Sequence, residues 1–138
     1  MPVSFRILPE HNLVLVTYTG IAGIAESLEK MAECSRHPDF RPWMRHCVDL
    51  SAVTGHEHDF VGFFALQAKG IEMFPQTADM LLLFIAPTRI GQELANMARR
   101  TWEGLDRVSV QIAQDEAAAL SMLGIPLERL AELGQAAD

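Results

Sequence analysis

The stretch Ala78-Asp79-Met80-Leu81-Leu82-Leu83-Phe84-Ile85-Ala86 is almost continuously apolar and decides the fold class. A strand that other layers cover on both faces reads as such a run, because neither face meets water. The run is far shorter than the roughly 20 apolar residues that a membrane-spanning helix needs. We therefore expect a central strand of a largely parallel sheet and no membrane span.

Strand and helix patterns alternate on both sides of this run. Two β-rich segments, 5–8 and 13–18, flank the turn-forming tetrad Pro9-Glu10-His11-Asn12 and predict an N-terminal hairpin. Further strands are expected at 47–50 and 106–113, and helices from residue 21, over 60–74, from 88 to about 104, and over 116–123, with a short tail at 127–133. The order ββαβαβαβα predicts one α/β domain over residues 1–138, with a mixed, mostly parallel sheet.

Composition narrows the class of protein. The chain has 138 residues, 49% of them hydrophobic, and a net charge of −7, which disfavours nucleic acid as a partner. No basic segment followed by an apolar core opens the sequence, as a secretory signal would require. The two cysteines, Cys34 and Cys47, lack the spacing of metal ligands and are expected to pack in a core. A cytoplasmic protein is the expectation.

The segment His37-Pro38-Asp39-Phe40-Arg41-Pro42-Trp43, leading into Val48-Asp49-Leu50-Ser51-Ala52-Val53, resembles the STAS superfamily, named for sulphate transporters and anti-sigma-factor antagonists. It looks most like the small bacterial stand-alone branch called SpoIIAA-like. The Ala-rich segment ending at Gly124 is similar to that branch's closing helix, and the similarity covers residues 5 to about 123. The resemblance implies an STAS-like layered fold and a partner-binding face.

The resemblance does not carry over the family's phosphorylation switch. In the antagonist proteins an Asp-Leu-Ser strand is soon followed by Asp-Ser-Ser-Gly, whose serine is phosphorylated. Here Asp49-Leu50-Ser51 matches, but Asp59 is followed by Phe60, which stands at the phosphoacceptor position. Ser51 and Thr54 are the nearby substitutes.

Polar side chains are expected to gather at the carboxyl edge of the sheet, where open α/β sheets bind ligands. The candidate ligand-binding or partner-binding residues are Asp49, Ser51, Thr54, His56, His58, Thr88 and Arg89. Thr88 and Arg89 open a helix, whose free N–H groups and dipole could hold an anion. The alternative is an ordinary helix cap with an exposed arginine.

The segment His56-Glu57-His58-Asp59 offers imidazoles and carboxylates for a metal or a general base. No further ligand set, nucleophile motif or phosphate-binding loop accompanies it, and a polar loop in which Asp59 caps the next helix explains these residues without a metal. We therefore assign no metal, cofactor or catalytic residue. A metal-dependent or hydrolytic enzyme that uses Asp49, His56 and His58 stays open as an alternative.

The helix expected over 60–74 is apolar around more than half of its circumference, which indicates a hydrophobic interaction surface. Its candidate residues are Phe60, Phe63, Phe64 and Phe74. The occupant could be a second copy in a homodimer, another protein or a small hydrophobic ligand, unless neighbouring helices cover the helix. The leading hypothesis is a non-enzymatic STAS-like binding or regulatory module, and the alternative is a carrier of a lipid or another small hydrophobic ligand.

Overall fold

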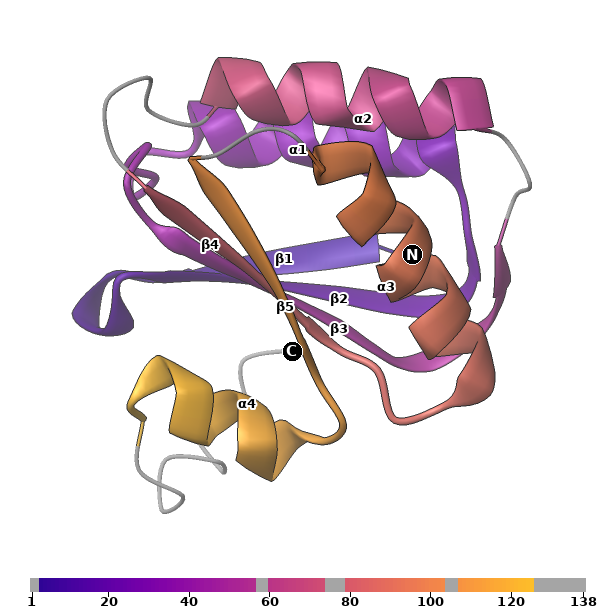
Figure 1. Cartoon of the computed structure of the whole chain (residues 1–138). Coiled ribbons are helices and arrows are strands. Elements are labelled where there is room, and N and C mark those ends of the chain that lie inside the picture. Colours follow the sequence, from indigo (N-terminus) through magenta and orange to yellow (C-terminus); the bar gives the residue numbers. More distant parts are fainter. Residues whose placement is uncertain (1–2, 57–59, 74–78, 104–106, 126–138) are drawn as a thin grey trace.

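The computed structural model describes residues 3–56, 60–73, 79–103 and 107–125 (Figure 1). Strands and helices alternate after an N-terminal hairpin, which confirms the expected α/β class. In chain order they are β1 (Val3–Leu8), a 3-10 turn (Pro9–His11), β2 (Leu13–Ala22), α1 (Ile24–Arg36), β3 (Arg45–His56), α2 (Phe60–Met73), β4 (Met80–Ile85), α3 (Arg89–Trp102), β5 (Val108–Ala113) and α4 (Glu116–Leu123).

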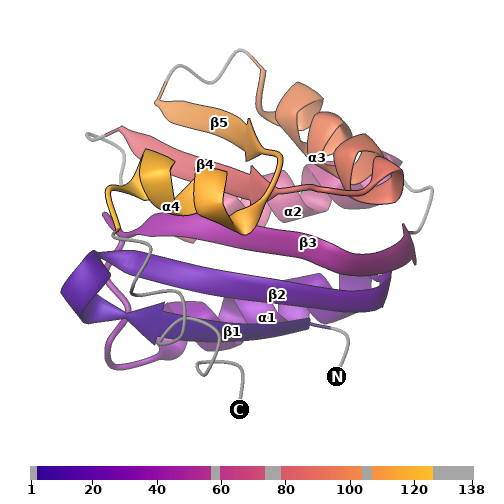
Figure 2. The ribbon, with the colours of Figure 1, turned by 90° about the horizontal axis from the view of Figure 1, so that it is seen from below.

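The strands form one mixed sheet in the order β1-β2-β3-β4-β5 (Figure 2). β1 pairs antiparallel with β2, and every later neighbour pairs parallel. Asn12 closes the hairpin with a left-handed backbone, at φ 53°, a conformation that asparagine tolerates better than most residues. The expected mixed, mostly parallel sheet with an N-terminal hairpin is therefore confirmed.

The helices are divided unequally between the two faces of the sheet. Helices α1, α2 and α3 lie over one face, and α4 lies over the other (Figure 1). Because side chains alternate along a strand, Val48 and Leu50 of β3 join the core beneath the three helices, whereas Cys47 joins the core beneath α4. The sheet thus separates the apolar packing on its two faces, and the position of a residue in a strand decides which face it reaches.

β4 is buried on both faces, as its apolar run predicts. Leu82 and Phe84 pack toward α3, and Leu83 and Ile85 pack toward α4. β4 is an interior strand between β3 and β5, but the middle of the sheet belongs to β3. The expectation that the apolar run is the central strand was therefore wrong by one position.

β3 continues through the segment that the sequence analysis treats as a polar loop. It runs to His56 because β2 extends to Ala22 beside it, with register shifts that each leave one extra residue in β3. Gly20, at φ 68°, allows β2 to follow this irregular edge. The extension also delays α1, which begins at Ile24, so that Ile21 lies exposed in β2.

The ends of α3 and α4 are fixed by side chains. Thr88 Oγ1 accepts a 3.0 Å hydrogen bond from Gly91 N, and Asp115 Oδ1 accepts one of 2.8 Å from Ala118 N. At the other end of α4, the Arg45 guanidinium donates to the carbonyl oxygens of Leu123 and His11, which ties the helix to the hairpin. The expected cap Asp59, the stop at Gly104 and the tail at 127–133 lie outside the described residues.

Across these described ranges, no helix combines the length and the apolar character that crossing a membrane would take.

Candidate functional site

Asp49 and Ser51 form a compact polar pair on the α4 side of the sheet. Asp49 Oδ1 accepts hydrogen bonds from Ser51 N at 2.9 Å and from Ser51 Oγ at 2.6 Å. Both side chains point away from the three-helix layer, because they alternate along β3 with Val48 and Leu50. The Asp49 carboxylate is thus used to fix the local backbone and the hydroxyl of Ser51.

The surroundings of Asp49 are acidic. Burial, and then the charge of Asp49, raises the pKa of Glu116 at the start of α4. Asp115, which caps the same helix, lies beside Glu116 in the chain. An anionic ligand at this part of the edge would meet repulsion from the carboxylates, so the acidic cluster does not resemble a phosphate site.

Thr88 and Arg89 behave as an ordinary helix start. The Thr88 hydroxyl caps α3, and the Arg89 side chain is 93% exposed, with Nε 3.7 Å from Glu93 Oε1 one turn along the helix. Such a solvent-exposed ion pair contributes little to the stability of the fold. The geometry therefore gives both residues local partners and does not aim the guanidinium at the helix N-terminus.

The remaining candidates at this edge are dispersed. Thr54 is exposed near the end of β3, and His56 is the last residue of that strand. His58 lies outside the described residues, as do Glu57 and Asp59. Among the side chains whose positions are described, no three His, Cys, Asp or Glu residues come together as metal ligands.

Helix α2 presents an apolar outer face to solvent. Val61 is 80% exposed, Phe64 58% and Ile71 40%. Their spacing of three and seven residues puts them on one stripe of the helix. Phe64 is thus where the sequence predicts an interaction surface, while the side chains of Phe60 and Phe63, and Phe74 as a whole, fall outside the described part of the chain.

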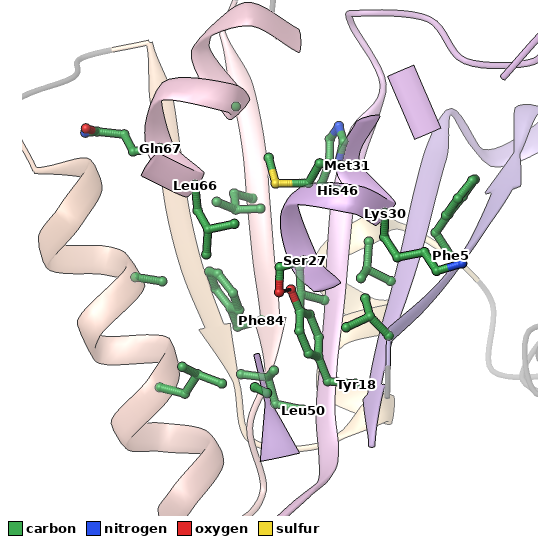
Figure 3. A pocket seen from close by; sticks show the side chains of 18 of the residues that line it. Phe5, Tyr18, Ser27, Lys30, Met31, His46, Leu50, Leu66, Gln67 and Phe84 are labelled. Carbon is green, nitrogen blue, oxygen red and sulfur yellow. Dashed lines mark hydrogen bonds between the residues drawn. The ribbon is translucent and has the colours of Figure 1, made fainter. Parts of the chain in front are cut away.

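An apolar cavity of about 160 Å³ lies between the sheet and helices α1, α2 and α3 (Figure 3). Most of its lining is aliphatic, aromatic or sulfur-containing. The walls include Val16, Val48 and Phe84 from the sheet, and Met31, Leu66 and Leu94 from the helices. The cavity is therefore on the opposite side of β3 from Asp49 and Ser51.

Two hydroxyl groups meet inside this cavity. Tyr18 of β2 donates a 2.8 Å hydrogen bond to Ser27 Oγ of α1, and Ser27 Oγ donates one of 2.7 Å to the Gly23 carbonyl oxygen (Figure 3). Burial raises the pKa of Tyr18, and the bond to Ser27 offsets part of that effect. The pair is a neutral polar spot within apolar walls.

His46 contributes a second neutral polar group to the lining. It is 6% exposed, and its ring meets Phe40 edge-on with centroids 6.3 Å apart. Burial lowers the pKa of His46 to about 4, so the imidazole carries no charge near neutral pH. The histidine thus extends the uncharged lining of the cavity.

Lys30 is the charged lining residue in the described part of the chain. Its Nζ lies 3.1 Å from Glu33 Oε2, and its side chain is 19% exposed. In Figure 3 it extends toward Phe5 of β1, away from the Tyr18–Ser27 pair. The alkyl stem of Lys30 therefore lines the cavity, while its ammonium group is directed to Glu33.

Gln67 links the two helices that cover the far side of the cavity. Its Nε2 donates a hydrogen bond to the carbonyl oxygen of Thr101 near the end of α3. Leu66, the preceding residue of α2, points into the cavity (Figure 3). The contact holds α2 beside α3, so that the two helices close the space over β3 and β4.

This cavity was not predicted from the sequence. Its polar residues carry a weak signal. Ser27 stands three residues after Ile24 and four before Met31 on the buried stripe of α1, and His46 directly precedes the apolar pair Cys47-Val48 in β3. Each alone is typical of ordinary packing. Only the three-dimensional arrangement brings Tyr18, Ser27 and His46 to one space.

The chain matches no model of a known protein family, and no curated protein matches it. The resemblance to the STAS superfamily therefore stays an interpretation of the sequence.

Proposed function

We propose that this chain is a non-enzymatic, STAS-like binding module whose ligand is a small hydrophobic molecule held between the sheet and helices α1, α2 and α3. The observation that carries the proposal is the apolar cavity of about 160 Å³ with a few neutral polar groups. Small-molecule sites combine predominantly apolar walls with a small number of polar groups that orient the ligand.

The size of the cavity limits the ligand. An engineered protein cavity of about 150 Å³ binds benzene or xenon. The cavity here is of that order, so it suits a molecule of one or two rings or a short alkyl chain. A whole phospholipid would require the helices to move apart, which favours a compact ligand over a membrane lipid.

The hydrogen bonding supports binding rather than hydrolysis. A serine nucleophile needs a base that takes its proton. The Ser27 hydroxyl instead donates to the Gly23 carbonyl oxygen. A carbonyl oxygen accepts hydrogen bonds, but it is too weak a base to remove the proton of a hydroxyl. His46 is buried and neutral in the sheet beneath, and its low pKa makes it a weak general base.

The relationship to the STAS superfamily is supported by the element order and by the mixed sheet that begins with a hairpin. A regulatory role would follow if ligand occupancy changed how the module meets a partner. The proposal includes a cytoplasmic location, which the sequence leads us to expect.

The proposal is tested by titrating the protein with toluene and following its ¹H–¹⁵N NMR spectrum. We expect saturable shifts at lining residues such as Val48 and Phe84. Ala98→Phe, which adds a ring to the cavity wall on α3, should abolish them, because the added ring occupies the ligand volume. Ala117→Phe, at an exposed position of α4 on the other side of the sheet, should not. Toluene shifts that survive Ala98→Phe unchanged would refute the proposal.

A second function, self-association, is favoured by the exposed stripe of Val61, Phe64 and Ile71 on α2. Apolar side chains that gather on one face of a soluble domain mark interaction sites, and a two-fold pairing of the same stripe would cover both copies. We propose that a second copy of the chain covers this surface.

A further inference from the structure

The hydrogen-bond chain inside the cavity leaves acceptors and no spare hydroxyl hydrogen. The Gly23 carbonyl can only accept, so the hydrogen of Ser27 Oγ is used in that 2.7 Å bond. Ser27 Oγ must then accept the 2.8 Å bond from the Tyr18 hydroxyl, which uses the hydrogen of Tyr18. A hydroxyl oxygen has two lone pairs, and the Tyr18 oxygen uses neither of them in these two hydrogen bonds.

The charges around the cavity disfavour an anion. Lys30 is the charged side chain among the described lining residues, and its Nζ is directed to Glu33 at 3.1 Å. It extends toward Phe5 rather than toward Tyr18 (Figure 3). His46 stays neutral near pH 7 because burial lowers its pKa to about 4. An ionised carboxylate beside Tyr18 would lose its water without gaining a cation or a hydroxyl donor.

We propose that the cavity selects uncharged, ring-sized molecules that carry a hydrogen-bond donor, such as phenols and indoles, and rejects the corresponding carboxylates. The Tyr18 oxygen accepts the hydrogen of the ligand, and the apolar walls hold its ring. This selectivity rests on the proposed function, because it requires the cavity to bind small molecules.

Three ligands that share one ring test the selectivity: toluene, p-cresol and p-toluate, with dissociation constants measured by calorimetry at pH 7. We expect p-toluate to bind at least about tenfold more weakly than p-cresol, because an unpaired buried charge is costly. Tyr18→Phe should weaken p-cresol relative to toluene by about fivefold, the loss of one hydrogen bond of about 1 kcal/mol.

Ser27→Ala provides a second variant, which frees the hydrogen of Tyr18 and leaves the Tyr18 oxygen able to accept. Without Ser27 Oγ, the Tyr18 hydrogen is released and the tyrosine becomes a donor. p-Tolunitrile, a neutral ligand that can only accept, should then bind more tightly relative to toluene than it does in the wild-type protein, whereas p-cresol can still donate to the Tyr18 oxygen. The matched control is Ser35→Ala on the same helix, whose Oγ donates to the Ala32 carbonyl and does not line the cavity. It should leave every affinity ratio unchanged.

The outcomes separate the two proposals. If p-toluate binds as tightly as p-cresol, or if Tyr18→Phe leaves the ratio of p-cresol to toluene unchanged while toluene still binds, the selectivity is wrong and the binding function stands. If none of the three ligands binds the folded protein, the binding function fails and the selectivity fails with it. If Ser27→Ala leaves the affinity of p-tolunitrile relative to toluene unchanged, the assignment of the Tyr18 hydrogen to Ser27 Oγ, and with it the role of Tyr18 as a pure acceptor, is overturned.

Discussion

The Tyr18 hydroxyl lies 2.8 Å from Ser27 Oγ and joins strand β2 to helix α1 through the apolar cavity. The two residues are nine positions apart, separated by the irregular end of β2 and the turn into α1. The bond therefore fixes where α1 begins relative to the sheet, besides setting the polarity of the cavity.

A double-mutant cycle should detect this contact as a coupling in stability. Tyr18→Phe and Ser27→Ala, alone and together, should give a coupling energy of about 1 kcal/mol in urea unfolding, because a buried hydrogen bond contributes about that much. The matched cycle with Tyr18→Phe and Ser35→Ala should give a value near zero. Equal coupling in both cycles would mean that the contact does not act between Tyr18 and Ser27.

Stability should fall between pH 7 and pH 5 because of His46. Burial lowers the pKa of His46 from 6.5 to about 4, so the unfolded chain takes up a proton in this window that the folded chain does not. The contribution of His46 to the free energy of unfolding is therefore complete above pH 6.5, and it is lost as the pH falls toward 4. The expected loss between pH 7 and pH 5 is about 2 kcal/mol, measured by urea unfolding.

The variants for this measurement are His46→Leu and His37→Gln. His46→Leu removes the buried imidazole and should flatten the pH profile over the window. His37→Gln changes an exposed histidine whose Nδ1 accepts from Asp39 N, and should leave the slope in place. A slope that survives in His46→Leu would assign the proton uptake to another group.

Arg45 should be a major contributor to stability. Its guanidinium donates to the carbonyl oxygens of Leu123, at the end of α4, and of His11, in the hairpin turn. Arg45→Met keeps much of the stem but leaves both carbonyls without this donor, at an expected cost of about 2 kcal/mol in urea unfolding. Arg6→Met, on the exposed side of β1, should cost far less. Equal effects of the two substitutions would contradict this assignment.

The outer stripe of α2 predicts a homodimer. Light scattering with size-exclusion chromatography should give twice the 15.3 kDa chain mass, and Phe64→Lys should give the single mass, because a charge would be buried at the centre of the stripe. The control is Met122→Lys, which alters an exposed apolar residue of α4. A wild-type protein that is monomeric at every concentration would rule out self-association.

The fold was predictable where the sequence pattern is strong. The apolar run Met80–Ile85 identified a strand buried on both faces, and Thr88 marked the start of the helix that follows. The extension of β3 to His56 was not predictable, because Ser51, Thr54 and Gly55 have the composition of a loop. Pairing with the equally extended β2 overrides that local preference.

The candidate site was harder to predict, for a geometric reason. Asp49 and Ser51 are conspicuous in the sequence because they are polar residues near the end of a predicted strand. In the structure they hydrogen-bond to each other. The cavity depends on which strand positions face the helices and on how closely α2 approaches α3, through contacts such as Gln67 to Thr101. Neither property has a local signature in the sequence.

Crystals of the protein pressurised with xenon would test the central claim most directly, because xenon occupies apolar cavities and its position is visible without knowledge of the natural ligand. We expect xenon between the sheet residues Val48 and Phe84 and the helix residues Leu66 and Leu94. Side chains that fill this space, with xenon bound only elsewhere, would contradict the proposal that the chain holds a small hydrophobic ligand there.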